Sequence, residues 1–132
     1  MTTTGTAARR NGDAGERLVA AALARAGWTI LARNMRLGRD ELDIIAIDPG
    51  PPAALVVVEV RRRGRRDFGL AEETLDRRKR AAMRRAVGAL LEGGLLPEGL
   101  PLPRLPLRVD LVAIDRTPDG RPSVRHHRAI RP

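Results

Sequence analysis

The 132-residue sequence contains no cysteine. This absence excludes a disulfide framework and a thiolate zinc site, and it is consistent with a reducing compartment such as the cytoplasm. A chain of this length buries a core large enough for one domain without such cross-links. We therefore expect one cytoplasmic domain that apolar packing holds together.

Aromatic residues and long apolar runs are also scarce. Trp28 and Phe68 are the only aromatic residues, which argues against binding of single strands by base stacking. No apolar run approaches the ~20 residues that span a membrane, and residues 1–10 lack the apolar centre of a signal peptide. We expect a disordered tail over residues 1–11 and a single domain over residues 12–132.

Acidic residues are in the minority. Lys and Arg total 25, Asp and Glu total 16, and the net charge is +9 at pH 7. Such an excess favours polyanionic partners, because each neutralised phosphate releases counterions. Lys79 is the only lysine, so 24 of the 25 basic residues are arginine. A GC-rich genome produces the same bias on solvated faces. Nucleic-acid binding and a merely solvated basic surface are therefore both open from charge alone.

Turn residues and hydrophobic periodicity divide the chain into seven elements. Asp13-Ala14-Gly15-Glu16 has the form of a capping box at the start of a helix, which Gly27 ends. The predicted strands cover residues 28–33, 41–47, 54–60, 107–115 and 123–130, and a second helix covers residues 71–92. Residues 95–106 form a proline-rich loop. The order α-β-β-β-α-β-β predicts an α/β sandwich in which two helices cover the sheet.

Two carboxylates, Asp43 and Glu59, lie inside otherwise apolar strands. Burial of a carboxylate is costly unless it is paired, hydrogen-bonded or bound to a metal. A turn over residues 48–52 sets a hairpin register with three opposed pairs, Ile47–Leu55, Ile45–Val57 and Asp43–Glu59. Opposed like charges repel, and a divalent cation between them would remove the repulsion. The alternative is a structural ion pair with Arg61 or Arg63.

Glu16 and Lys79 each have two interpretations. Glu16 completes the capping box, which is the interpretation we favour, but it also lies on the helix face that points at the sheet and is within reach of the same site. Lys79 falls on the apolar face of the second helix. It either extends along the edge of the core or has a role that needs a compact ammonium.

Short motifs in a fixed order extend over almost the whole chain. They are Gly12-x-x-Gly15-Glu16, Gly27-Trp28, Asn34-x-Arg36, Glu41-Leu42-Asp43, Val58-Glu59-Val60-Arg61, Phe68-Gly69, Lys79 and Arg108-Val109-Asp110. Each motif is weak alone, but the ordered set is specific. In this ordered set of motifs the chain resembles the YraN-type uncharacterised protein family of bacteria, which belongs to the restriction-endonuclease-like (PD-(D/E)xK) superfamily.

The resemblance implies a three-layer restriction-endonuclease-like core, in which helices flank a central mixed sheet. It also implies a metal site built from Asp43 and Glu59, with the backbone carbonyl of Val60 as a further ligand and Glu16 joining from the helix. The cofactor would be Mg²⁺ or Mn²⁺, which would bind the scissile phosphate, activate a water and stabilise the developing negative charge.

Two positions depart from the family pattern. The family's Glu-x-Lys is Glu59-x-Arg61 here. Lysine can help to deprotonate the attacking water, whereas arginine stays charged and can only stabilise the phosphate. Lys79 is the candidate that would supply a lysine from the helix. The family's Gly-Glu-x-Asp reads Asp40-Glu41-Leu42-Asp43, which adds a carboxylate beside the site.

Three functions are compatible with these features. The first is a Mg²⁺-dependent endonuclease acting on branched or structured DNA, with the catalytic residues Asp43, Glu59, Arg61, Glu16 and Lys79. Its nucleic-acid-binding residues would be Arg36, Arg62, Arg63, Arg65 and Arg66. The second is a catalytically inactive DNA- or RNA-binding domain on a degenerate nuclease core.

The third function is an interaction protein that docks acidic partners, with residues 95–106 as its docking surface. The candidate partners are nucleic acid, with DNA preferred, and a second copy of the chain in a homodimer; no membrane partner is expected.

Overall fold

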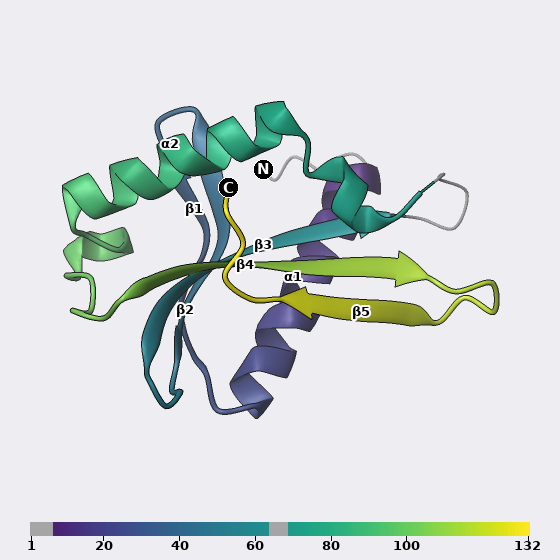
Figure 1. The fold of residues 1–132 in the computed structure, drawn as a ribbon, viewed down its shortest axis with the longest axis horizontal. Helices are drawn as coiled ribbons and strands as arrows, with labels where there is room; N and C mark the ends of the chain where they lie inside the picture. Colours follow the sequence, from purple (N-terminus) through teal and green to yellow (C-terminus); the bar gives the residue numbers. More distant parts are fainter. Residues whose placement is uncertain (1–6, 64–68) are drawn as a thin grey trace, which may run out of the picture.

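The computed structural model describes residues 7–63 and 69–132, with side chains from residue 14 onward. The main elements are helix α1 (Ala7–Arg25), strands β1 (Thr29–Leu37), β2 (Asp40–Asp48) and β3 (Ala54–Arg63), helix α2 (Arg77–Gly93), and strands β4 (Leu107–Arg116) and β5 (Pro122–His127) (Figure 1). Two short 3-10 helices, η1 (Ala71–Thr74) and η2 (Pro97–Gly99), precede and follow α2. The predicted order α-β-β-β-α-β-β is confirmed.

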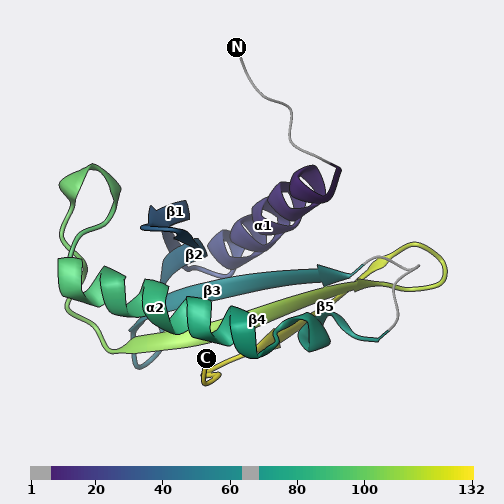
Figure 2. The ribbon, with the colours of Figure 1, turned by 90° about the horizontal axis from the view of Figure 1, so that it is seen from above.

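The five strands form one mixed sheet in the order β1-β2-β3-β4-β5. Strands β3 and β4 are parallel, with α2 in the connection between them, and the other neighbouring pairs are antiparallel. Helices α1 and α2 lie on opposite sides of β3 and β4 (Figure 2). The protein therefore has the predicted three layers, and its central strands are apolar on both faces because each face is covered.

Each helix covers its own apolar core. Side chains alternate along β3, so Leu55 and Val57 enter the core under α2, whereas Val56 and Val58 enter the core under α1. All four side chains are almost fully buried. Among the described residues, Trp28 is the aromatic member of these two cores, which are otherwise built from aliphatic side chains and Met83.

The hairpin of β2 and β3 has the predicted register. Its ladder includes the pairs Ile47–Leu55 and Ile45–Val57, and its last pair is Ile44–Val58. Asp43 and Glu59 come one step beyond that last pair. The two strand carboxylates are thus brought to the same end of the hairpin.

The predicted helix over residues 71–92 is divided in the structure. Residues 71–74 form η1, and α2 begins only at Arg77 because Asp76 is its N-cap. The Asp76 carboxylate accepts a hydrogen bond from the N–H of Lys79 at 2.8 Å. At the other end Gly94 adopts a φ of 67°, and its N–H donates to the carbonyl of Leu90 at 2.9 Å.

The predicted start of the first helix at Asp13 is wrong. Helix α1 begins at Ala7, so residues 13–16 lie inside it and do not form a capping box. The alanine and arginine residues that precede Asp13 are strong helix formers, which explains the extension. Residues 7–11, predicted as part of a disordered tail, are therefore helical, and the rest of that tail lies outside the described residues.

The proline-rich segment 95–106 packs on the molecule. Leu96 is buried in the core under α2, and Leu102 and Leu105 pack against the same core.

In the part of the chain that the structure describes, no helix combines the length and the apolar character needed to cross a membrane.

Asp110, in the middle of β4, is a fully buried carboxylate with a complete set of partners. Its Oδ1 accepts hydrogen bonds from Nε of Arg108 at 2.9 Å and from the N–H of Ala129 at 3.0 Å. Its Oδ2 accepts from Nη2 of Arg108 at 3.0 Å and lies 2.8 Å from Nε2 of His126. The motif Arg108-Val109-Asp110 thus holds β5 and the C-terminal segment against β4.

Candidate functional site

The candidate site lies where β2 and β3 part. Figure 1 shows β3 continuing beside β4 after β2 has turned away from it. At this point the N–H of Val60 donates a hydrogen bond to Oδ2 of Asp43 at 2.9 Å. On the other side of β2, the pairing with β1 skips Asp43 and Asn34, and Asn34 has a φ of 54°. Asn tolerates this conformation better than most residues, so Asn34 provides the local irregularity beside Asp43.

Glu59 is buried next to Asp43, with only 2% of its surface exposed. Burial, with the neighbouring charge and hydrogen bond of Asp43, raises the pKa of Glu59 to about 8 against the opposing effect of Lys79 and Arg61. Nζ of Lys79 lies 3.3 Å from Oε2 of Glu59, and Nη1 of Arg61 lies 3.4 Å from the same oxygen. Lys79 of α2 therefore reaches the strand carboxylate.

Arg61, which stands at the position of the family's lysine, is held in place by η1. Its Nε donates to Oγ1 of Thr74 at 2.7 Å, and its Nη2 donates to the Thr74 carbonyl at 3.2 Å. Two of its donors are thus engaged away from Glu59. Of the two cations at Glu59, Arg61 is the more tightly fixed and Lys79 is the one that carries a compact ammonium.

Asp43 also belongs to a set of three carboxylates. Glu16 of α1, Glu41 and Asp43 each offer one oxygen, and these oxygens all lie within 4.8 Å of one another. Glu59 adjoins the set through its hydrogen bond with Asp43. Oxygen donors of this kind suit hard divalent cations such as Mg²⁺ and Mn²⁺. The donor set is therefore chemically compatible with the cofactor that the sequence suggested.

The sequence placed Glu16 correctly on the sheet-facing side of its helix, but the capping role favoured for it is wrong. Glu16 is buried where α1 packs on the sheet, and Gly15, one residue earlier, lies next to Ile114 of β4. Glu41 was not among the predicted site residues. The sequence did contain a signal for Glu41: it is two residues from Asp43, and residues i and i+2 of a strand share a face.

Asp40 does not join these carboxylates, although the sequence placed it beside the site. Its two oxygens accept hydrogen bonds from Nη2 and Nε of Arg85 on α2 at 3.1 Å and 3.2 Å. This pair fastens the turn between β1 and β2 to α2. Asp40 thus has a structural partner that the sequence did not reveal, because Arg85 is 45 residues away along the chain.

The predicted nucleic-acid-binding arginines are only partly described. Arg36 is highly exposed and lies 3.9 Å from Glu41, so it is near the carboxylates. Arg62 and Arg63 are half-buried at the end of β3. Arg65 and Arg66 lie outside the described residues. The carbonyl of Val60, predicted as a metal ligand, belongs to the residue whose N–H binds Asp43.

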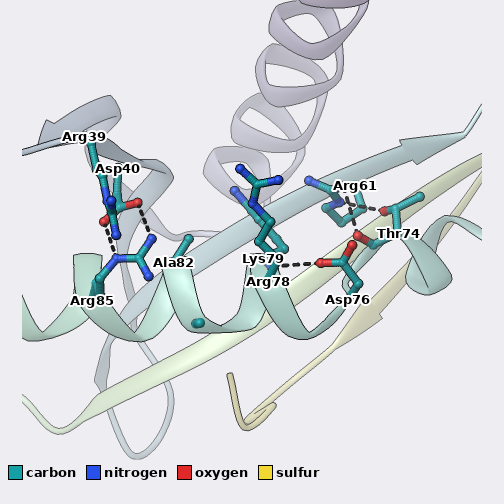
Figure 3. Close-up of a pocket in the computed structure, with 10 residues that line it drawn as sticks. Arg39, Asp40, Arg61, Thr74, Asp76, Arg78, Lys79, Ala82 and Arg85 are labelled. Carbon is teal, nitrogen blue, oxygen red and sulfur yellow. Dashed lines mark hydrogen bonds and ion pairs between the residues drawn. The ribbon is translucent and has the colours of Figure 1, made fainter.

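A groove of about 610 Å³ opens beside Lys79, between the β1–β2 turn and α2 (Figure 3). The residues that line it are Arg39, Asp40, Arg61, Thr74, Asp76, Arg78, Lys79, Ala81, Ala82 and Arg85. Five of them are cationic and two are acidic, so its lining is strongly basic. Arg39, Arg78 and Arg85 were not predicted as site residues, because only the folded chain brings the β1–β2 turn next to α2.

Comparison with known proteins matches the chain to one family. The sequence profile of the Uncharacterised protein family UPF0102 matches residues 15–114. A UPF0102 protein of Roseiflexus castenholzii is 42% identical over 105 residues, which cover 80% of this chain and 78% of the relative. UPF0102 proteins of Symbiobacterium thermophilum and Streptomyces coelicolor are 39% and 36% identical, covering 86% and 90% of this chain and 88% and 86% of the relatives. The resemblance to the YraN-type family is thereby confirmed, and the chain belongs to the Uncharacterised protein family UPF0102.

Proposed function

We propose that the protein is a metal-dependent endonuclease that acts on DNA in the cytoplasm, with branched or structured DNA as its substrate class. The observation that carries the proposal is the meeting, at one end of the β2–β3 hairpin, of several carboxylates with one lysine. Lys79 lies 3.3 Å from Glu59, and the cluster of Glu16, Glu41 and Asp43 adjoins Glu59 through Asp43. Such a combination of like charges in a partly buried place is typical of functional sites.

The carboxylates are the residues that would hold the metal. Asp43 links the set to Glu59, because it forms a hydrogen bond with Glu59 and one of its oxygens lies within 4.8 Å of oxygens of Glu16 and Glu41. The carbonyl of Val60 is a further proposed ligand. A bound Mg²⁺ or Mn²⁺ would supply a Lewis acid for the phosphate and a more acidic bound water.

The remaining side chains have roles that follow from their charge. Hydrolysis adds the oxygen of one water to phosphorus and breaks the bond from phosphorus to one ester oxygen, which then takes up a proton. Negative charge develops on the phosphate oxygens during this reaction, and a fixed cation nearby stabilises it. Arg61, held by Thr74, is placed to bind the phosphate, and the ammonium of Lys79 is the second cation at the same carboxylate.

A second candidate function is a DNA-binding protein without catalysis. The observation that favours it is the pairing of Glu59 with both Lys79 and Arg61, two cations that offset the charge of this buried group without a metal. In that case the protein itself supplies the counter-charges of Glu59, and only the basic groove contacts DNA.

Calorimetric titration with Mg²⁺ and Mn²⁺ distinguishes these functions. We compare the wild type with Asp43→Ala and Glu59→Ala, and we use Glu92→Ala, an exposed carboxylate on α2, as the matched control. The nuclease proposal predicts metal binding by the wild type and the control and loss of binding in both site variants, with folding intact by circular dichroism. The same four proteins are then incubated with labelled branched DNA and Mg²⁺, where only the wild type and Glu92→Ala should cleave.

Failure to bind metal with and without DNA, together with absent cleavage, would contradict the nuclease proposal. DNA binding that persists in Asp43→Ala without metal would then support the non-catalytic function. Metal binding that survives in both site variants would locate the metal elsewhere and remove the structural basis of the proposal.

A further inference from the structure

The basic groove beside Lys79 is separate from the carboxylate cluster, although the two share a wall. Lys79 and Arg61 line the groove and also contact Glu59, so this end of the groove lies next to the carboxylates. Figure 3 shows Arg39 at one end of the groove, Arg78 and Lys79 along it, and Arg61 with Thr74 at the other end. The cations thus form a row that leads to the proposed site of cleavage.

We propose that this groove binds the sugar-phosphate backbone of one DNA strand, with Arg39 and Arg78 as its phosphate-binding residues. This inference rests on the proposed nuclease function in one respect, namely that the bound DNA strand runs toward Glu59. It does not depend on cleavage, because phosphate binding by these arginines needs no metal.

Arg39 and Arg78 are the cations of the groove that are available to a ligand. Both acidic groups of the lining are already engaged, Asp40 with Arg85 and Asp76 with the first turn of α2. Within residues 7–63 and 69–132, neither Arg39 nor Arg78 forms a hydrogen bond or ion pair with another side chain, and both are exposed. Two exposed guanidinium groups on facing walls are well suited to phosphate oxygens, which they bind in a forked geometry.

The shape of the groove indicates how much of the nucleic acid enters it. Besides its cations, α2 contributes Ala81 and Ala82 to the lining, and their short side chains leave room above the helix. A hollow of about 610 Å³ is in the range of pockets that hold small ligands, so a short stretch of the backbone of one strand fits in it. No aromatic residue is among its lining residues, so we expect contacts to phosphate without base stacking and therefore without sequence preference.

The test is equilibrium binding of a short fluorescent DNA duplex with a single-stranded arm, in EDTA so that no cleavage takes place. The double variant Arg39→Ala/Arg78→Ala is compared with Arg84→Ala/Arg104→Ala, which removes the same charge from exposed arginines outside the groove. We expect the groove variant to bind about tenfold more weakly. We also expect the slope of log K against log salt to become shallower by about 1.4–1.8, because each of the two lost phosphate contacts contributes about 0.7–0.9. The loss should be equal for two unrelated DNA sequences. The control should lose less than twofold.

Equal losses in the two double variants would overturn the groove as a specific site, because only net charge would then matter. Absence of salt-dependent binding by the wild type would overturn it as well. Loss of binding confined to the groove variant supports the inference even when the wild type fails to cleave DNA with Mg²⁺, in which case the nuclease function alone fails. Thermal melting of all variants confirms that each is folded.

Discussion

Glu59 is the side chain whose environment differs most from that of an ordinary glutamate. Burial and the adjacent Asp43 raise its pKa to about 8, compared with 4.5 for an unperturbed side chain. Between these two values the folded protein binds more protons than the unfolded chain. The free energy of unfolding of the metal-free protein therefore falls as the pH rises from about 4.5 to about 8.

We predict that Glu59→Gln removes this loss of stability. The amide is neutral at every pH, so the variant should match the wild type near pH 5 and should exceed it near pH 8 by roughly 2–4 kcal/mol. Urea denaturation of the metal-free proteins across this range measures the difference, with Glu92→Gln as the exposed control. If the free energies of unfolding of the wild type and Glu59→Gln changed in parallel across this pH range, Glu59 would be ionised in the folded protein.

Helix α2 connects the two parts of the candidate site, because it carries Lys79 at Glu59 and Arg78 in the groove. Its position depends on its ends and on its attachment to the β1–β2 turn. Asp76 caps its first turn, and Arg85 binds Asp40 of β2. A weakened first turn would therefore affect the placement of Lys79 as well as the stability of the helix.

We predict that Asp76→Ala lowers the free energy of unfolding by about 1 kcal/mol, because the N–H of Lys79 loses its acceptor. Asp76→Ser restores an acceptor of the same kind and should recover most of that loss. Chemical denaturation of the three proteins at neutral pH provides the values. A loss that is equal in the alanine and serine variants would mean that the charge of Asp76, rather than its cap, stabilises α2.

Across the whole molecule, ion pairs and hydrogen bonds join segments that are separated in the sequence. Asp110 joins β4 to β5 and to Ala129, while Glu72 of η1 accepts hydrogen bonds from Arg125 of β5 at 2.6 Å and 2.7 Å. Despite burial, hydrogen bonds from His126 and Arg108 lower the pKa of Asp110 to about 2. The hydrogen bond from Arg125 is the main cause that lowers the pKa of Glu72 to about 2.

Both groups therefore stabilise the folded protein above pH 4–5, and this contribution is lost as the pH falls toward about 2. We predict that Asp110→Asn lowers the free energy of unfolding at neutral pH by about 3 kcal/mol, because it leaves Arg108 without its main buried partner. The difference from the wild type should shrink as the pH falls below about 4. Thermal melts between pH 2 and 7 would contradict the assignment if the difference stayed constant.

The sequence by itself determined the local structure and the identity of most site residues. Apolar runs bounded by turn residues predicted the central strands, and the turn over residues 48–52 set the register that brings Asp43 and Glu59 to one end of the hairpin. The position of those two carboxylates inside apolar strands marked them as candidate site residues. These features depend on neighbours in the chain, so they can be predicted without the fold. The capping box at Asp13 was the local pattern that misled, because the preceding residues also favour a helix.

Contacts between distant segments were decided only by the tertiary structure. Lys79 meets Glu59, Asp40 binds Arg85, and Glu16 joins Glu41 because α1 and α2 pack on opposite faces of the sheet at a particular angle and translation. No sequence spacing encodes those two quantities. They follow from the shapes of the two apolar cores, which many side chains determine together.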